Sequence, residues 1–117
     1  MALHIYRVTV RGFFTDLDAE VRERLLAEAE DHDALRAEFT EAGTLTYGRA
    51  LDAFSFRYQL RVRLDDEDDD RALADATAEQ AGLDRANATL DAAGITAKRL
   101  RVSVANMADV WAGDDRR

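Results

Sequence analysis

The chain has 117 residues, a formal net charge of −8 and 47% hydrophobic residues, but no cysteine. These values predict one globular domain over residues 1–117, exclude disulfides and thiolate metal sites, and disfavour nonspecific binding to nucleic acid or to an anionic membrane. The N-terminus lacks a signal-peptide pattern and no apolar run approaches the roughly 20 residues that span a bilayer, so we expect a cytoplasmic protein.

The first predicted elements are a strand and a helix. Residues 3–13 alternate with period two between apolar side chains and polar ones such as Arg7 and Arg11, which predicts a strand with one buried face. Thr15 has the chemistry of a helix N-cap, and apolar residues at every fourth position after it predict an amphipathic helix that ends near residue 30.

Two strands follow and form a predicted antiparallel hairpin. They cover residues 44–50 and 54–64, are rich in β-favouring residues, and are joined by a short connection. A short turn over residues 35–39 precedes them.

A run of six acids at residues 65–70 leads into the second helix. The plain interpretation is a solvated loop that caps this helix. A hard-cation site is the alternative, although the run lacks the glycine and the distal glutamate of an EF-hand loop. The helix is expected to bury a stripe from Leu73 through Leu83 to Leu90 and to end at Gly94.

The last predicted strand covers residues 97–105. After it we expect a single turn whose Met107, Val110 and Trp111 pack on an apolar surface, and a flexible tail over residues 112–117. The order strand, helix, strand, strand, helix, strand predicts an α+β fold. We expect a ferredoxin-like βαββαβ sandwich, in which a four-stranded antiparallel sheet carries two helices on one face. The first and third strands would be central in that sheet.

The predicted strands separate positive from negative charge. They hold nine of the 16 Lys and Arg residues and none of the 24 Asp and Glu residues. Because the arginines alternate with apolar residues, they should project from the face opposite the helices. The candidate ligand-binding residues on this face are Arg7, Arg11, Arg57, Arg61, Arg99 and Arg101. An equally open interpretation is that these arginines only keep the strands soluble and protect the sheet edge.

The arginine face favours an anionic partner. Guanidinium groups pair bidentately with carboxylates and phosphates, so a small anionic molecule or an acidic protein segment fits this face. RNA is disfavoured because the aromatic residues of the central strands share the core parity, which leaves only Phe13 to stack a base beside the arginines. A homodimer is a further candidate, formed through an edge strand or a helix surface, because stacking two such faces directly would oppose arginines.

Catalytic and metal-binding signatures are lacking in the sequence. His32 lies between two aspartates, but neighbouring loop residues seldom converge on one ion, and His4 is the only other histidine. The serines form no nucleophile elbow and the glycines form no phosphate-binding loop. We therefore assign no catalytic residue, no metal ligand and no cofactor. The sequence does not exclude enzymatic activity, but the lack of these signatures favours a protein without it.

Four short motifs resemble a family of small, functionally uncharacterised proteins from GC-rich bacteria. The matching stretches are residues 6–12, 43–47, 54–58 and 107–111. The resemblance spans nearly the whole chain and implies no catalytic residues. At the level of the fold, the chain also looks like small ligand-sensing domains and dimeric α+β-barrel domains.

These observations predict a cytoplasmic binding or regulatory domain whose arginine face contacts an anionic ligand or an acidic protein surface. Two alternatives remain. One is a small enzyme with a pocket between the sheet and the C-terminal turn, using His32 or an acid as base. The other is a structural homodimer without a ligand.

Overall fold

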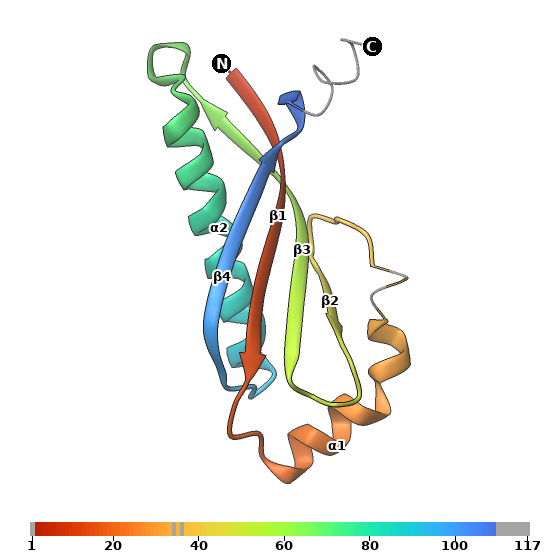
Figure 1. Cartoon of the computed structure of the whole chain (residues 1–117). Helices are drawn as coiled ribbons and strands as arrows, with labels where there is room; N and C mark the ends of the chain where they lie inside the picture. The colour runs from red at the N-terminus through yellow and green to blue at the C-terminus, as the bar shows by residue number, and fades with distance from the viewer. Residues whose placement is uncertain (1, 34, 36, 110–117) are drawn as a thin grey trace.

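Figure 1 shows the computed structural model of the chain, which describes residues 2–33, 35 and 37–109. Its elements are β1 (Ala2–Phe14), α1 (Ala19–Ala27), the 3-10 helix η1 (Ala29–His32), β2 (Thr44–Tyr47), β3 (Ala53–Leu64), the 3-10 helix η3 (Asp66–Asp68), α2 (Arg71–Ala92) and β4 (Ala97–Asn106). The strands form one antiparallel sheet in the order β2-β3-β1-β4, with β1 and β3 central. The predicted α+β fold, a four-stranded antiparallel sheet packed against helices, is confirmed.

The two faces of the sheet differ in burial, as the alternation of residue types predicts. The register places Val8 of β1 beside Tyr58 of β3 and Val104 of β4. Val8 and Tyr58 are buried in the hydrophobic core, and Val104 packs against it. This apolar face is covered by α2, which runs behind the sheet in Figure 1. The opposite face, called the open face below, carries the side chains of alternate parity.

Small residues bring α2 close to the sheet. The buried residues of α2 are Ala74, Ala78, Gly82, Ala86 and Leu90. A Cβ atom on Gly82 would lie only 2.6 Å from Cγ1 of Val8. Apart from Leu90, the predicted leucine stripe is wrong, because Leu73 is 46% exposed and Leu83 is only partly buried. The closest approach of α2 is to Val8 and Val10 of β1, and a close-packed interface at this distance has room there only for small side chains.

The first helix begins later than predicted and ends in a 3-10 turn. Thr15 is not its cap, because the Thr15 amide donates to the carbonyl of Thr96 at 3.0 Å. Asp16 has a φ of 48° in the left-handed region, so the chain turns before the helix can begin. Val21 and Leu25 are its buried residues. In Figure 1, α1 lies at the lower end of the sheet, beside β2.

Beyond β4, the chain turns into a short helical segment in which Met107 is buried, as expected. Val110 and Trp111, which we expected to pack with Met107, and the predicted tail over residues 112–117 lie outside the described residues. Among the helices that the structure describes, none is long and apolar enough to cross a membrane.

Candidate anion-binding groove

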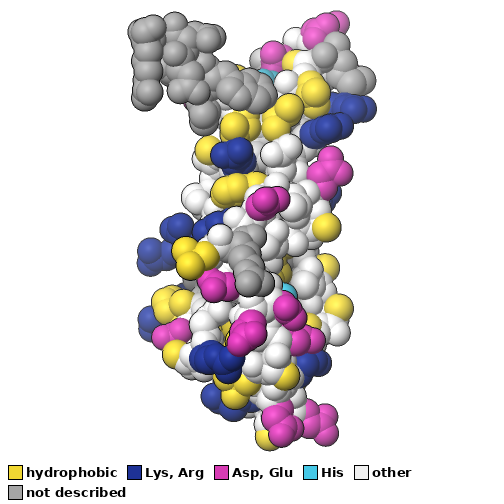
Figure 2. Space-filling view, turned by 90° about the vertical axis from the view of Figure 1, so that its right-hand side faces the viewer, with side chains coloured by type: hydrophobic (Ala, Val, Ile, Leu, Met, Phe, Trp, Pro, Cys, Tyr) yellow, Lys and Arg dark blue, Asp and Glu magenta, His cyan; other side chains and the backbone are white. Residues whose placement is uncertain are grey.

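The six candidate arginines come from three strands of the sheet. Arg7 and Arg11 lie on β1, Arg57 and Arg61 on β3, and Arg99 and Arg101 on β4. In Figure 2, Lys and Arg side chains lie along the left margin at mid-height, at the upper right and towards the lower end, with Asp and Glu side chains at the centre and at both ends. The contacts of the six arginines divide them into two groups of three.

Arg7, Arg57 and Arg61 form the first group, which we call the engaged arginines because the chain itself binds them. The guanidinium carbons of Arg7 and Arg57 lie 5.2 and 5.8 Å from the centroid of the Phe39 ring, within the range of cation–π attraction. Nη1 of Arg57 also donates to the carbonyl oxygen of Ala37 at 3.1 Å. The aromatic ring therefore offsets part of the repulsion between two arginines that the central strands bring together.

The third engaged arginine, Arg61, has its Nε atom 3.8 Å from a carboxylate oxygen of Glu41. Glu41 and Phe39 belong to a segment that the strand order alone does not place. Thr40 forms a parallel bridge with Tyr58, and the carbonyl oxygen of Thr40 accepts the amide hydrogen of Gln59 at 2.8 Å. This bridge holds the segment against β3 just beyond the end of β2.

Arg11, Arg99 and Arg101 form the second group, which we call the unpaired arginines. Arg11 and Arg101 lie directly opposite each other in the pairing of β1 with β4, so their Cα atoms are about 5 Å apart. Within the described part of the chain, none of the three makes a side-chain hydrogen bond, ion pair or cation–π contact. Like charges at this spacing destabilise a sheet unless an anion balances them.

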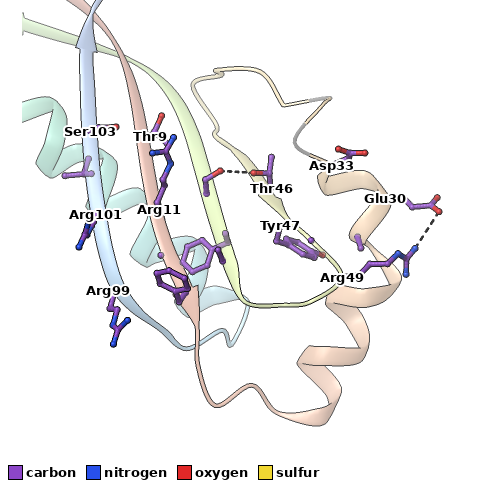
Figure 3. Close-up of a pocket in the computed structure, with 18 residues that line it drawn as sticks. Thr9, Arg11, Glu30, Asp33, Thr46, Tyr47, Arg49, Arg99, Arg101 and Ser103 are labelled. Carbon is purple, nitrogen blue, oxygen red and sulfur yellow. Dashed lines mark hydrogen bonds and ion pairs between the residues drawn. The ribbon is translucent and has the colours of Figure 1, made fainter.

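A groove of about 1110 Å³ opens beside the unpaired arginines, on the open face of the sheet. Figure 3 shows Arg11, Arg99 and Arg101 on one side of it, and Glu30 and Arg49 on the other. Pockets that hold small molecules usually measure about 300–1,000 Å³, so the groove has room for a ligand larger than a single phosphate.

A β-bulge brings Arg99 to the groove. The pairing of β1 with β4 shifts between Arg11 and Phe13, because Arg11 pairs with Arg101 whereas Phe13 pairs with Lys98. Arg99 lies in the bulged part of β4, between Lys98 and Arg101, and has a φ of 56°. A non-glycine residue in the left-handed region costs about 1 kcal/mol or more, and such residues are enriched at functional sites.

The lining of the groove includes hydroxyl-bearing side chains and one exposed aromatic residue. Thr9, Thr46, Ser55 and Ser103 supply hydroxyl groups, and the hydroxyls of Thr46 and Ser55 lie 2.8 Å apart. Phe13, which is 42% exposed, supplies an aromatic ring. The floor therefore offers hydrogen-bonding groups and one apolar platform beside the cationic side.

The side formed by η1 is less cationic. Arg49 lies 3.7 Å from a carboxylate oxygen of Glu30, and Asp33 accepts the amide hydrogen of Leu35 at 2.9 Å. Tyr47 also borders the groove, but its hydroxyl donates to the carbonyl oxygen of Leu25 at 2.6 Å. Burial raises the pKa of Tyr47, so its phenol stays protonated and is not a base at neutral pH.

The structure assigns His32 a packing role. Its Nδ1 atom lies 2.8 Å from the carbonyl oxygen of Leu45, and its ring stacks on Tyr47 with the centroids 5.0 Å apart. This contact covers the outer edge of β2, which would otherwise leave a backbone acceptor of the sheet unpaired. His32 is not among the residues that line the groove.

The acidic run over residues 65–70 caps α2, as expected. The side chain of Asp70 accepts the amide hydrogen of Ala72 at 2.9 Å. Among the described residues, no group of three or more His, Asp or Glu side chains is arranged to hold a metal ion.

A polar network that the sequence did not indicate lies at the opposite end of the sheet. Nε2 of His4 is 2.7 Å from a carboxylate oxygen of Asp69, and Nδ1 of His4 is 3.2 Å from Nδ2 of Asn106. Because an amide nitrogen only donates, Nδ1 accepts and the imidazole proton lies on Nε2, facing Asp69. Tyr6 donates to Asp75 at 2.5 Å nearby, and burial together with this carboxylate raises the pKa of Tyr6.

This network ties β1 to β4 and to the loop before α2. Its members are more than 60 residues apart in sequence, so no spacing pattern reveals them. The enzymatic alternative placed its pocket near this end, at the turn after β4, whereas the groove described above lies beside the first half of β4.

Comparison with known protein families identifies the family of the chain. A family model matches residues 1–117, the whole sequence. The chain belongs to DUF6204, a family of unknown function. No curated protein and no solved structure matches it. Membership confirms the resemblance to a functionally uncharacterised family, and DUF6204 itself carries no activity that could be transferred to the groove.

Proposed function

We propose that this protein is a non-enzymatic, cytoplasmic binding domain that holds an anionic small molecule in the groove through Arg11, Arg99 and Arg101. The observation that carries the proposal is the collection of three unpaired guanidinium groups on one side of a groove. Guanidinium groups bind carboxylates and phosphates through parallel, charge-assisted hydrogen bonds.

The acidic composition of the chain makes the three unpaired arginines stronger evidence for an external anion. The sequence holds 24 Asp and Glu residues against 16 Lys and Arg residues, so carboxylates are abundant. The fold uses them to pair Arg49, Arg61 and Arg71. The side chains of other arginines among the described residues, such as Arg22 and Arg63, also lack an ion-pair partner. The three unpaired arginines differ because they lie together beside one groove, where an anion from outside would relieve their mutual repulsion.

The proposal narrows the predicted ligand-binding set from six arginines to three. Arg7, Arg57 and Arg61 already contact Phe39, Ala37 or Glu41, so we assign them to the support of the sheet. An acidic protein segment remains the competing partner for the same three arginines. A second copy of the chain stacked face to face would oppose its own arginines, so we place any homodimer interface elsewhere.

Isothermal titration calorimetry with citrate, inorganic phosphate and benzoate tests the proposal. The double variant Arg11→Gln/Arg101→Gln should bind the preferred anion about tenfold or more weakly, since each charge-assisted hydrogen bond contributes about 1.5–3 kcal/mol. The control Arg61→Gln/Arg63→Gln removes the same charge from the same face outside the groove.

The control should keep nearly full affinity, because charges farther away than a Debye length of about 8 Å are largely screened at physiological salt. Equal losses in both double variants would show that the anion responds only to the overall field. If the wild type binds none of the three anions, the proposal is wrong. Binding of a hexaglutamate peptide in their place would assign the groove to an acidic protein segment.

A further inference from the structure

Phe13 carries an inference about the class of ligand. Phe13 is 42% exposed, and every other Phe or Tyr among the described residues is buried or half-buried. It follows Gly12 and precedes Phe14, both of which are buried. Phe13 therefore points to the open face because of its position in the strand, and it lines the groove.

The neighbours of Phe13 leave its ring accessible. Its partners across the sheet are Ala53 on β3 and Lys98 on β4, a small side chain and a long flexible one. Phe14 and Phe54 pack against each other on the core side, with their ring centroids 4.8 Å apart. No ring contact or cation–π contact involves Phe13 in the described part of the chain.

Phe39 provides the contrast within the same face. Its ring is already covered, because the guanidinium groups of Arg7 and Arg57 lie over it. Phe13 also has arginines nearby, yet among the described residues no guanidinium group or aromatic ring lies over its ring. An apolar platform that stays uncovered beside unpaired cations is suited to a ligand that has both an aromatic ring and a negative charge.

The spacing along the strand fits such a ligand. Phe13 and Arg11 are two residues apart on one face of β1, which places them about 7 Å from each other. Arg101 lies opposite Arg11, and the bulge brings Arg99 to the same side of the groove. A ring stacked on Phe13 would therefore direct a substituent one ring-length away toward the guanidinium groups.

We propose that the ligand of the groove is an aromatic anion, a planar ring that stacks on Phe13 and carries a carboxylate or phosphate bound by Arg11, Arg99 and Arg101. This inference rests on the function proposed above and specifies its ligand. Surfaces that bind a nucleic-acid strand use several aromatic platforms in succession, and the described groove has one exposed ring. A single ring system is therefore the expected occupant, from either an aromatic carboxylate or a nucleoside monophosphate.

Two matched ligand pairs separate the role of the ring from that of the charge. The first pair is 2-naphthoate and cyclohexanecarboxylate, and the second is adenosine 5′-monophosphate and ribose 5-phosphate. The wild type should bind the aromatic member of one pair about tenfold more tightly than its non-aromatic partner, because stacking on an aromatic side chain is worth that factor or more. The pair that shows the preference identifies the source of the anion.

Two variants then assign the preference to residues. Phe13→Leu keeps an apolar side chain at an exposed position and should abolish the preference while it leaves the affinity for the non-aromatic member unchanged. Arg101→Gln should weaken both members of the pair by the same factor. Circular dichroism spectra and thermal midpoints that match the wild type establish that both variants are folded.

The outcomes distinguish the two proposals. If the wild type binds both members of each pair equally, or if Phe13→Leu weakens both members equally, the aromatic inference is overturned and anion binding stands. If the wild type binds no member of either pair, both proposals fail.

Discussion

Gly82→Ala is expected to destabilise the protein, although alanine is the better helix former. The new methyl group would lie 2.6 Å from Cγ1 of Val8 and 3.6 Å from Cγ2 of Val10. Val8 and Val10 are fully buried under α2, so neither can move aside into solvent. Overpacking a core costs about 1–3 kcal/mol, whereas replacing glycine by alanine inside a helix gains about 1 kcal/mol. The free energy of unfolding should therefore fall by about 1 kcal/mol.

Val8→Ala supplies the background that isolates this contact. By itself it should cost about 2 kcal/mol, because it removes two buried methyl groups. In that background Gly82→Ala no longer meets Cγ1 and should stabilise the protein by about 1 kcal/mol, so the coupling energy is about 2 kcal/mol. Urea unfolding followed by circular dichroism measures the four proteins of the cycle. If Gly82→Ala stabilises the wild type and the Val8→Ala variant equally, the close approach of α2 to β1 is refuted.

The remaining predictions concern two glycines and two tyrosines. Gly43→Ala should lower the free energy of unfolding by about 2 kcal/mol or more, because Gly43 has a φ of 92° and its Cβ would lie 2.1 Å from Cε1 of Tyr58. Gly48→Ala should leave the free energy of unfolding unchanged, because no atom lies within 4 Å of its Cβ. Urea unfolding measures both variants. Tyr6→Phe should lower the free energy of unfolding by about 1–2 kcal/mol in the same assay, because it deletes the hydrogen bond to Asp75. Tyr58→Phe should leave the free energy of unfolding unchanged or raise it, since the Tyr58 hydroxyl has no hydrogen-bond partner within the described residues. Burial raises the pKa of Tyr58 from 10.0 to about 12, so the folded state holds this proton more tightly: stability should be complete below pH 10 and fall as the pH rises toward 12, with a shallower fall in Tyr58→Phe. A wild-type protein whose stability rises over that alkaline range would contradict the buried phenol.

The strands and their order could be predicted because their signal is local and repetitive. Alternation along β1 and β3 places every second side chain in the core, and the observed burial follows that alternation. The packing of α2 could not be predicted in the same way. A stripe of leucines is the stronger hydrophobic signal, but α2 approaches Val8 and Val10 so closely at Gly82 that alanine and glycine occupy most of its buried positions. The size of the partner decides which stripe is buried.

The candidate site was predicted in part. Parity identifies arginines on the open face, but it cannot show that Phe39 would cover two of them, because the segment before β2 has no periodic pattern. Gly12 near the end of the first strand indicates a bulge or bend, and the pairing of β1 with β4 does shift between Arg11 and Phe13. The left-handed conformation of Arg99 could not be predicted, since such a residue other than glycine leaves no sequence signature. The exposure of Phe13 follows from parity, which predicts that this ring lies on the open face beside the arginines.

The division of the arginines into engaged and unpaired groups is the claim on which the proposed function depends. NMR of the arginine side-chain Nε–H groups, recorded while the preferred anion is titrated into ¹⁵N-labelled protein, tests it most directly. The Nε–H signals of Arg11, Arg99 and Arg101 should shift to saturation together, and those of Arg7, Arg57 and Arg61 should stay in place. Shifts of the same size in all six signals, or shifts confined to Arg7, Arg57 and Arg61, would contradict this division.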